Sequence, residues 1–198
     1  METGLNLNDT ETLQTAENSA GNLDTLIALS ELPEGLRVLD KSCITPNIMN
    51  LCNHLHDFKQ GIVYLTGLGH GKTTNAAGIL LSYLYWKRFS RTFNNVGFFV
   101  NALELCRLNS RKYDERFDYL MHRITDSQCV VVDGVPNYMT LFDEQLIEEL
   151  YEKRLYADGI TVFTSSMVPD IPANSSIMMG RALTRIASSC KLKEVFNG

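Results

Sequence analysis

Few features of a membrane, secreted or zinc-binding protein occur in this sequence. No apolar run approaches the roughly 18 residues that a membrane-spanning helix needs, and the first residues lack the basic start and apolar core of a secretory signal. The five cysteines are widely spaced and form no Cys-x-x-Cys pair, which argues against a disulfide framework or a zinc site. These absences predict a cytoplasmic protein with no membrane partner.

The composition is that of an ordinary globular protein, with 44% hydrophobic and 21% charged residues in a chain of 198. Such values exclude a fibrous or wholly disordered chain, and the length suits one well-buried domain. The charge is uneven, because residues 1–40 hold eight acids and one base, a net of −7, whereas the whole chain carries −5. We therefore expect an acidic, largely flexible segment at 1–40 and a folded core at 41–198.

Short apolar runs alternate with helical patterns from residue 60 onward. Strands are predicted at 61–66, 96–100, 129–133, 160–164 and 191–196, and the intervening segments include an amphipathic helix at 144–156. Strands separated by helices form parallel sheets that are covered on both faces. The predicted fold class is therefore α/β.

The strongest motif is a glycine-rich turn between the first strand and the helix that follows it. It reads TGLGHGKTT over residues 66–74 and fits the P-loop pattern G-x-x-x-x-G-K-[ST] at every position except the first, where Thr66 replaces glycine. Backbone N–H groups of such a loop converge on phosphate oxygens at the positive end of the following helix. A plain strand-to-helix turn is the alternative. The predicted nucleotide contacts are Gly67, Leu68, Gly69, His70, Gly71, Lys72, Thr73 and Thr74.

Two of these residues have specific roles in a P-loop: Lys72 would reach the β- and γ-phosphates, and Thr73 would place its hydroxyl on Mg²⁺. Asp133 ends the third predicted strand and is the expected second Mg²⁺ ligand, although Asp133-Gly134 is also a common turn pair. Gly134 stands where a second acid commonly follows to polarise the attacking water. The sequence therefore predicts an ATPase whose hydrolysis is slow or depends on a partner.

The segments from about residue 45 to 196 resemble the DnaC/IstB-type branch of the AAA+ ATPases, the bacterial and phage replicative helicase loaders and transposition helper ATPases. The resemblance lies in residues 96–111 (VGFFVNALELCRLNSR), 129–137 (CVVVDGVPN), 144–166, where Arg154 and Thr161 have the family spacing, and 180–190 (GRALTRIASSC). It implies an AAA+-like five-stranded parallel sheet with no C-terminal lid domain, and ATP and Mg²⁺ as cofactors. It also implies self-association on ATP binding.

The same resemblance implies roles for three residues late in the chain. Ser166 occupies the sensor-1 position, where the family usually has asparagine. Arg181 or Arg185 would be an arginine finger that acts in trans, with Lys72 and Asp133 completing the catalytic set. The two arginines are four residues apart and so share one helix face. A solvated basic face is the alternative for that pair.

A basic cluster lies between the second and third strands, where the family has a helical insertion that touches single-stranded DNA. Its candidate nucleic-acid contacts are Arg107, Arg111, Lys112 and Arg116, with Arg123 nearby. Acidic residues interleave with these bases, so a solvated helix face is the alternative.

Together these features predict an ATP-binding loader that recruits a replicative DNA helicase to single-stranded DNA, with the acidic segment at 1–40 as the candidate helicase-docking element. Three alternatives remain: a transposition helper ATPase of the IstB type, which shares the same core, a small nucleoside or nucleotide kinase, and a nucleotide-binding adaptor that hydrolyses ATP weakly.

Overall fold

A parallel five-stranded sheet organises the described part of the chain, which comprises residues 22–89, 95–111, 114–137, 139–166 and 181–197 of the computed structural model. The strand order is β2-β3-β4-β1-β5, and every pairing is parallel. This arrangement confirms the predicted α/β fold class. The strands are β1 (Gly61–Thr66), β2 (Gly97–Asn101), β3 (Cys129–Val135), β4 (Ile160–Ser165) and β5 (Leu192–Val195).

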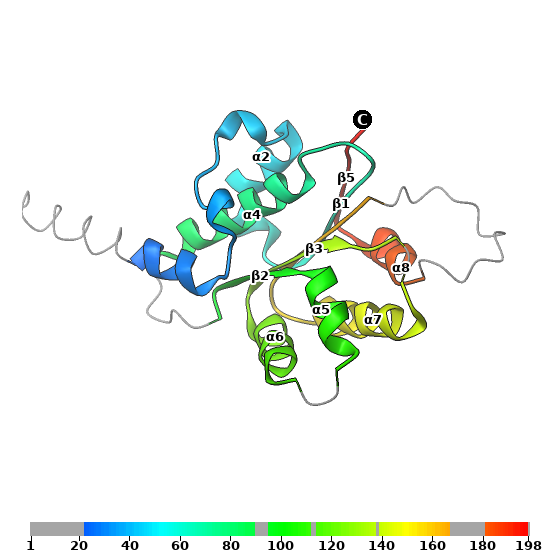
Figure 1. Cartoon of the computed structure of the whole chain (residues 1–198). Helices are drawn as coiled ribbons and strands as arrows, with labels where there is room; N and C mark the ends of the chain where they lie inside the picture. Colours follow the sequence, from blue (N-terminus) through cyan, green and yellow to red (C-terminus); the bar gives the residue numbers. More distant parts are fainter. Residues whose placement is uncertain (1–21, 90–94, 112–113, 138, 167–180, 198) are drawn as a thin grey trace, which may run out of the picture.

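Helices cover both faces of the sheet (Figure 1). One face carries α2 (Pro46–Asn53), α3 (Leu55–Phe58) and α4 (Lys72–Lys87), and the other carries α5 (Ala102–Asn109), α6 (Glu115–Asp126), α7 (Leu141–Leu155) and α8 (Arg181–Ser189). Because successive strand residues point to opposite faces, Val63 and Leu65 pack in the core beneath α4, whereas Ile62 and Tyr64 pack in the core beneath α5–α8. The sheet is therefore buried on both sides.

Side-chain caps determine where the helices on the second face begin. Asn101 accepts hydrogen bonds from the backbone N–H groups of Leu103 and Glu104 at the start of α5, and Asp114 does the same at the start of α6. Thr140 and Asp143 form a reciprocal capping box at the start of α7. Helix α7 consequently begins at Leu141, three residues before the predicted start at residue 144.

Residues N-terminal to position 41 contribute to the packed core. Residues 22–29 are helical, and Leu26 and Leu32 are buried against α4 and its neighbours. The carbonyl of Ser30 accepts a hydrogen bond of 2.7 Å from the N–H of Phe99 in the edge strand β2. The packed body thus begins before the expected boundary at residue 40. Residues 1–21 lie outside the described residues, and the docking role expected for segment 1–40 stays a prediction.

Among the described residues, none of the helices combines the length and the apolar composition that crossing a bilayer would need.

Candidate nucleotide site

The glycine-rich loop lies at the carboxyl end of β1, between Thr66 and the first residue of α4, Lys72. Gly67 (φ 107°) and Gly71 (φ 95°) adopt left-handed backbone conformations that other residues rarely adopt. The chain therefore turns sharply and enters α4 with the unpaired N–H groups of its first turn facing the loop. The predicted setting of a P-loop, a strand followed by a turn and a helix, is present.

The segment after β5 forms one wall of the loop. The N–H of Gly69 donates to the carbonyl oxygen of Phe196 (2.8 Å), and the N–H of Phe196 donates to the carbonyl oxygen of Thr66 (2.8 Å). A Cβ atom on Gly67 or Gly69 would lie less than 3.0 Å from the backbone of Phe196 or Asn197. These two glycines are therefore required by the packing of β5 as well as by any phosphate. No sequence pattern indicated this contact, because it joins segments that are about 130 residues apart.

The ammonium group of Lys72 reaches back over the loop. Its Nζ donates to the carbonyl oxygens of Gly67 (2.7 Å) and Gly69 (2.5 Å). Burial lowers the pKa of Lys72 below its ordinary value, and the nearby Asp133 carboxylate opposes that shift. The lysine thus lies where phosphate oxygens could replace the two carbonyls as acceptors.

Thr73 and Asp133 meet at the centre of the site, although 60 positions separate them. The Thr73 hydroxyl donates to Oδ1 (2.9 Å) and Oδ2 (3.2 Å) of the Asp133 carboxylate, which is 8% exposed. A hydroxyl and a carboxylate are hard oxygen donors of the kind that Mg²⁺ prefers, and this Thr–Asp combination holds Mg²⁺ in P-loop NTPases. The residues present therefore fit a magnesium–nucleotide complex.

Thr164 of β4 orients the Asp133 carboxylate. Its hydroxyl donates to Asp133 Oδ1 (2.7 Å) and accepts the N–H of Gly134 (2.7 Å). Sequence reasoning missed Thr164 and selected Ser166, which follows β4 and is exposed. The only sequence signal for Thr164 was its place in a buried strand, where a threonine needs a hydrogen-bond partner. The sensor role of Ser166 remains a prediction.

Gly134 lies in an irregularity of the ladder between β3 and β4, where the register shifts between Val132 and Val135. Its φ of 72° is left-handed, and no atom lies within 4 Å of the position that a Cβ would occupy. β3 therefore continues to Val135, two residues beyond the predicted end. The space beside Gly134 could accept a side chain, but the backbone there favours glycine.

Of the other loop residues, Leu68 and His70 are exposed and Thr74 is partly buried in the first turn of α4.

The two candidate arginine fingers differ in their surroundings. Arg185 is held by Glu148 and by Glu152 (2.9 Å) on α7, and its guanidinium lies over the Tyr151 ring. Arg181 begins α8 at the same end of the sheet as the loop, and its backbone N–H donates to Oε1 of the buried Glu144 (2.6 Å). The Arg181 side chain is exposed and forms no ion pair within the described part of the chain.

Arg154 has a structural position at the opposite end of the sheet. It is 2% exposed; its Nε donates to Thr161 Oγ1 (2.8 Å), and its Nη1 donates to the carbonyls of Ile124, Thr125 and Ser127. These carbonyls end α6, where the helix dipole favours a cation. Burial lowers the pKa of the Arg154 guanidinium. The spacing of Arg154 and Thr161 therefore reflects a direct contact that joins α6, α7 and β4.

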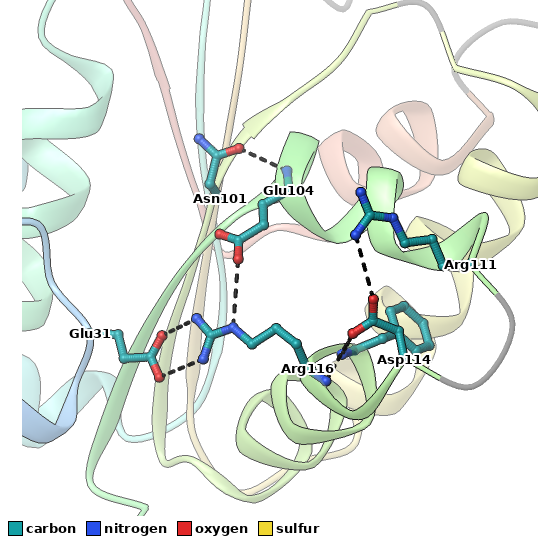
Figure 2. Close-up of polar contacts among 7 residues, drawn as sticks. Glu31, Asn101, Glu104, Arg111, Asp114 and Arg116 are labelled. Atoms are coloured by element: carbon teal, nitrogen blue, oxygen red, sulfur yellow. Dashed lines mark hydrogen bonds and ion pairs between the residues drawn. The ribbon is translucent and has the colours of Figure 1, made fainter.

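The candidate DNA-contacting bases are partly neutralised by neighbouring acids (Figure 2). Arg116 donates to both carboxylate oxygens of Glu31 (3.1 and 2.6 Å) and lies 3.6 Å from Glu104, and Arg111 lies 3.8 Å from Asp114. Arg107 is exposed on α5.

Lys112 lies outside the described residues, and Arg123 donates to the carbonyl of Leu29. These ion pairs favour the solvated-face alternative for Arg111 and Arg116. DNA contact by the cluster stays a prediction.

Solved structures resemble this fold, whereas no protein-family model and no curated protein matches the sequence. A structure assigned as a primosome component of Streptococcus pyogenes serotype M3 has a TM-score of 0.59 at 15% identity and covers 88% of this chain and 94% of its own. A crystal structure of DnaI has a TM-score of 0.61 at 16% identity, over 85% and 95% of the two chains. The DnaC helicase loader has a TM-score of 0.48 at 16% identity, over 76% and 85%. At these identities the likeness concerns architecture: the chain has the fold of the DnaI and primosome-component structures, in agreement with the resemblance to DnaC/IstB-type AAA+ ATPases found in its sequence.

Proposed function

We propose that this chain binds ATP and Mg²⁺ and acts as a helicase loader. The glycine-rich loop and Lys72 would bind the phosphates, and Thr73 and Asp133 would hold the metal. When bound, Mg²⁺ would neutralise charge on the phosphate oxygens and so assist transfer of the terminal phosphoryl group. Thr164 would keep the Asp133 carboxylate turned toward Thr73.

The contact between Thr73 and Asp133 is the observation that supports this proposal most directly, because a shared Mg²⁺ site needs the hydroxyl at the start of α4 to lie beside the carboxylate of β3. Titration of a fluorescent ATP analogue with Mg²⁺ or with EDTA tests it. Binding should need Lys72, and Thr73→Ala should remove the Mg²⁺ dependence. Thr125→Ala, a threonine on the exposed side of α6, is the matched control. Equal affinity with Mg²⁺ and EDTA in the unsubstituted protein would contradict the proposal.

Loading of a replicative helicase onto single-stranded DNA is the second part of the proposal. Its support is the shared fold with DnaI and with a structure described as a primosome component. Fluorescence anisotropy of a labelled single strand, measured with ATP, ADP or no nucleotide, tests the DNA step. Binding that requires ATP and is lost in Lys72→Ala supports it, and nucleotide binding without any DNA response counts against it. A helicase pull-down with and without residues 1–21 tests recruitment.

One observation favours the weakly hydrolysing adaptor as a second candidate. Gly134 has no carboxylate to polarise water, and its left-handed backbone and its N–H bond to Thr164 hold the position in a form suited to glycine. In this variant of the proposal, nucleotide occupancy itself changes the affinity for partners and turnover is slow. Single-turnover hydrolysis, compared with the lifetime of the DNA complex, separates the two candidates.

A further inference from the structure

A second concave site lies on the other side of α4, away from the nucleotide loop. It has a volume of about 710 Å³ and is enclosed by residues 22–29, the segment from Arg37 to Ile44, α2 and the second half of α4. The part of α4 that lines it runs from Gly78 to Tyr85 and Trp86, so it begins about 9 Å along the helix from Lys72. Its floor is apolar, with Ile27 and Leu39 among the lining residues.

The charged residues that line this pocket are all basic, although Asp57, outside the lining, lies 3.3 Å from His56. Arg37, Lys41 and Arg88 line it together with His56, and none of the described lining residues is acidic. These three cations form no ion pair with a carboxylate in the described part of the chain; Arg88 instead lies 3.7 Å from the centre of the Tyr85 ring. The pocket therefore suits an apolar segment that carries negative charge.

Large apolar side chains at the mouth remain accessible. Tyr85 is 56% exposed and Trp86 is 43% exposed, beside Phe89 at 59%. Exposed aromatic clusters next to an apolar pocket mark binding surfaces. The chain itself contains one segment with the required chemistry. Residues 1–21 hold four acids and no base, and they include three leucines at positions 5, 7 and 13.

We propose that this pocket binds the acidic N-terminal segment, residues 1–21, of the same chain. The segment joins the helical residues 22–29, of which Leu23 and Ile27 line the pocket, so the covalent connection begins at the site itself. Twenty-one residues can extend up to about 70 Å, far more than the pocket requires. The leucines would enter the apolar floor, and Glu2, Asp9, Glu11 and Glu17 would face the cations at the rim.

Zero-length cross-linking of the full chain tests this docking. A carbodiimide couples carboxylates to amines that they contact, and Lys41 is the only lysine that lines the pocket among the described residues. Mass spectrometry should find Lys41 joined to Glu2, Asp9, Glu11 or Glu17 in the monomer. Lys153 on α7, on the other face of the sheet, is half-exposed and pairs with Glu149 (2.7 Å), so its coupling to Glu149 shows that the reagent has reacted and its coupling to residues 1–21 serves as an internal reference.

A leucine variant distinguishes binding of the segment in the pocket from chance contacts that arise only because the segment is covalently attached nearby. Leu5→Ser/Leu7→Ser/Leu13→Ser keeps every acid and leaves the described core unchanged, so it should lose the Lys41 cross-links if the leucines anchor the segment. Unchanged cross-links in this variant, or equal yields at Lys41 and Lys153, would overturn the proposal. A mixture of isotope-labelled and unlabelled chains is the further check, because cross-links that join the two populations would place the segment of a second copy in the pocket and also overturn it.

Trp86 gives an independent readout, because it is the single tryptophan of the chain and lines the pocket. Its fluorescence should be quenched by acrylamide more strongly in the leucine variant than in the unsubstituted protein. Glu115→Gln/Asp118→Asn on α6, which neutralises acids outside the pocket, should leave the quenching unchanged. Equal quenching in all three proteins would contradict docking.

Discussion

At the scale of single residues, two different structural constraints require glycine in the candidate nucleotide loop. Gly67 and Gly71 have left-handed backbones, whereas Gly69 has no such requirement and is limited by the backbone of Asn197 and Phe196, which occupies the place of a Cβ. A glycine motif that suggests only phosphate binding in the sequence is thus also a packing contact with the end of the sheet. We therefore expect substitutions at these positions to affect both stability and the proposed nucleotide binding.

Gly69→Ala should lower the free energy of unfolding by about 1–3 kcal/mol, because a methyl group is forced against backbone atoms that cannot move aside cheaply. Urea unfolding measures the loss. Gly35→Ala is the matched control, because no atom lies within 4 Å of its Cβ position and its φ is ordinary. Equal losses for the two variants would show that Phe196 and Asn197 do not restrict the loop.

Gly134→Asp should raise ATP turnover while costing about 1 kcal/mol of stability, since the left-handed backbone disfavours any side chain but the space beside it is open. Gly134→Asn has a similar shape and a similar tolerance of the left-handed backbone but lacks the carboxylate, and it is the control. Steady-state phosphate release measures turnover. Identical rates in the two variants would show that the missing acid does not limit hydrolysis.

At the scale of secondary-structure elements, α6, α7 and β4 are joined by one buried guanidinium. Arg154→Met keeps the apolar length but leaves the carbonyls that end α6 and the Thr161 hydroxyl without their donor. We expect a loss on the order of 3 kcal/mol in unfolding free energy. ATP affinity should not change, because this contact lies at the end of the sheet away from Lys72. A loss of affinity in the folded variant would contradict a purely structural role.

Helix α8 presents Arg181 to solvent and keeps Arg185 on α7, which favours Arg181 as the residue that acts on a neighbouring copy. Arg181→Ala should reduce ATP turnover on the order of 10³-fold if it is the finger. Mixing Arg181→Ala with Lys72→Ala chains should restore part of the activity, because each supplies what the other lacks. Arg185→Ala is the control, and a larger loss there than at Arg181 would reverse the assignment.

At the scale of the whole molecule, local sequence patterns predicted the strands and the glycine-rich loop, but they did not predict the contacts between segments that are far apart in the chain. The strands and the loop were predictable because apolar runs and a glycine-rich turn are local signals. Thr164 and Phe196 act across the sheet, so their roles depend on strand order and register, which one sequence does not reveal. The core contacts of Leu26 and Leu32 were hidden by the acidic composition around them.

Two N-terminal deletions should differ in their effect on stability, because only the longer one removes Leu26 and Leu32. Removal of residues 1–40 should lower the free energy of unfolding by about 3–6 kcal/mol, because two buried leucines and the bond from Phe99 to Ser30 are lost. Removal of residues 1–21 should cost much less. Thermal and urea unfolding of both chains test this. A helicase pull-down is therefore informative only with the shorter deletion, since the longer one also damages the core.

The bond between Ser30 and Phe99 has a consequence for how the protein behaves when it is damaged. It covers part of the β2 edge, whereas the β5 edge is protected by the charged side chains of Lys193 and Glu194. If a protease cut near residue 33 and released the N-terminal piece, the sheet would have a bare, apolar edge rich in phenylalanine and valine. Such molecules could capture one another strand to strand, so limited proteolysis would turn a dispersed protein into one that aggregates from its β2 side.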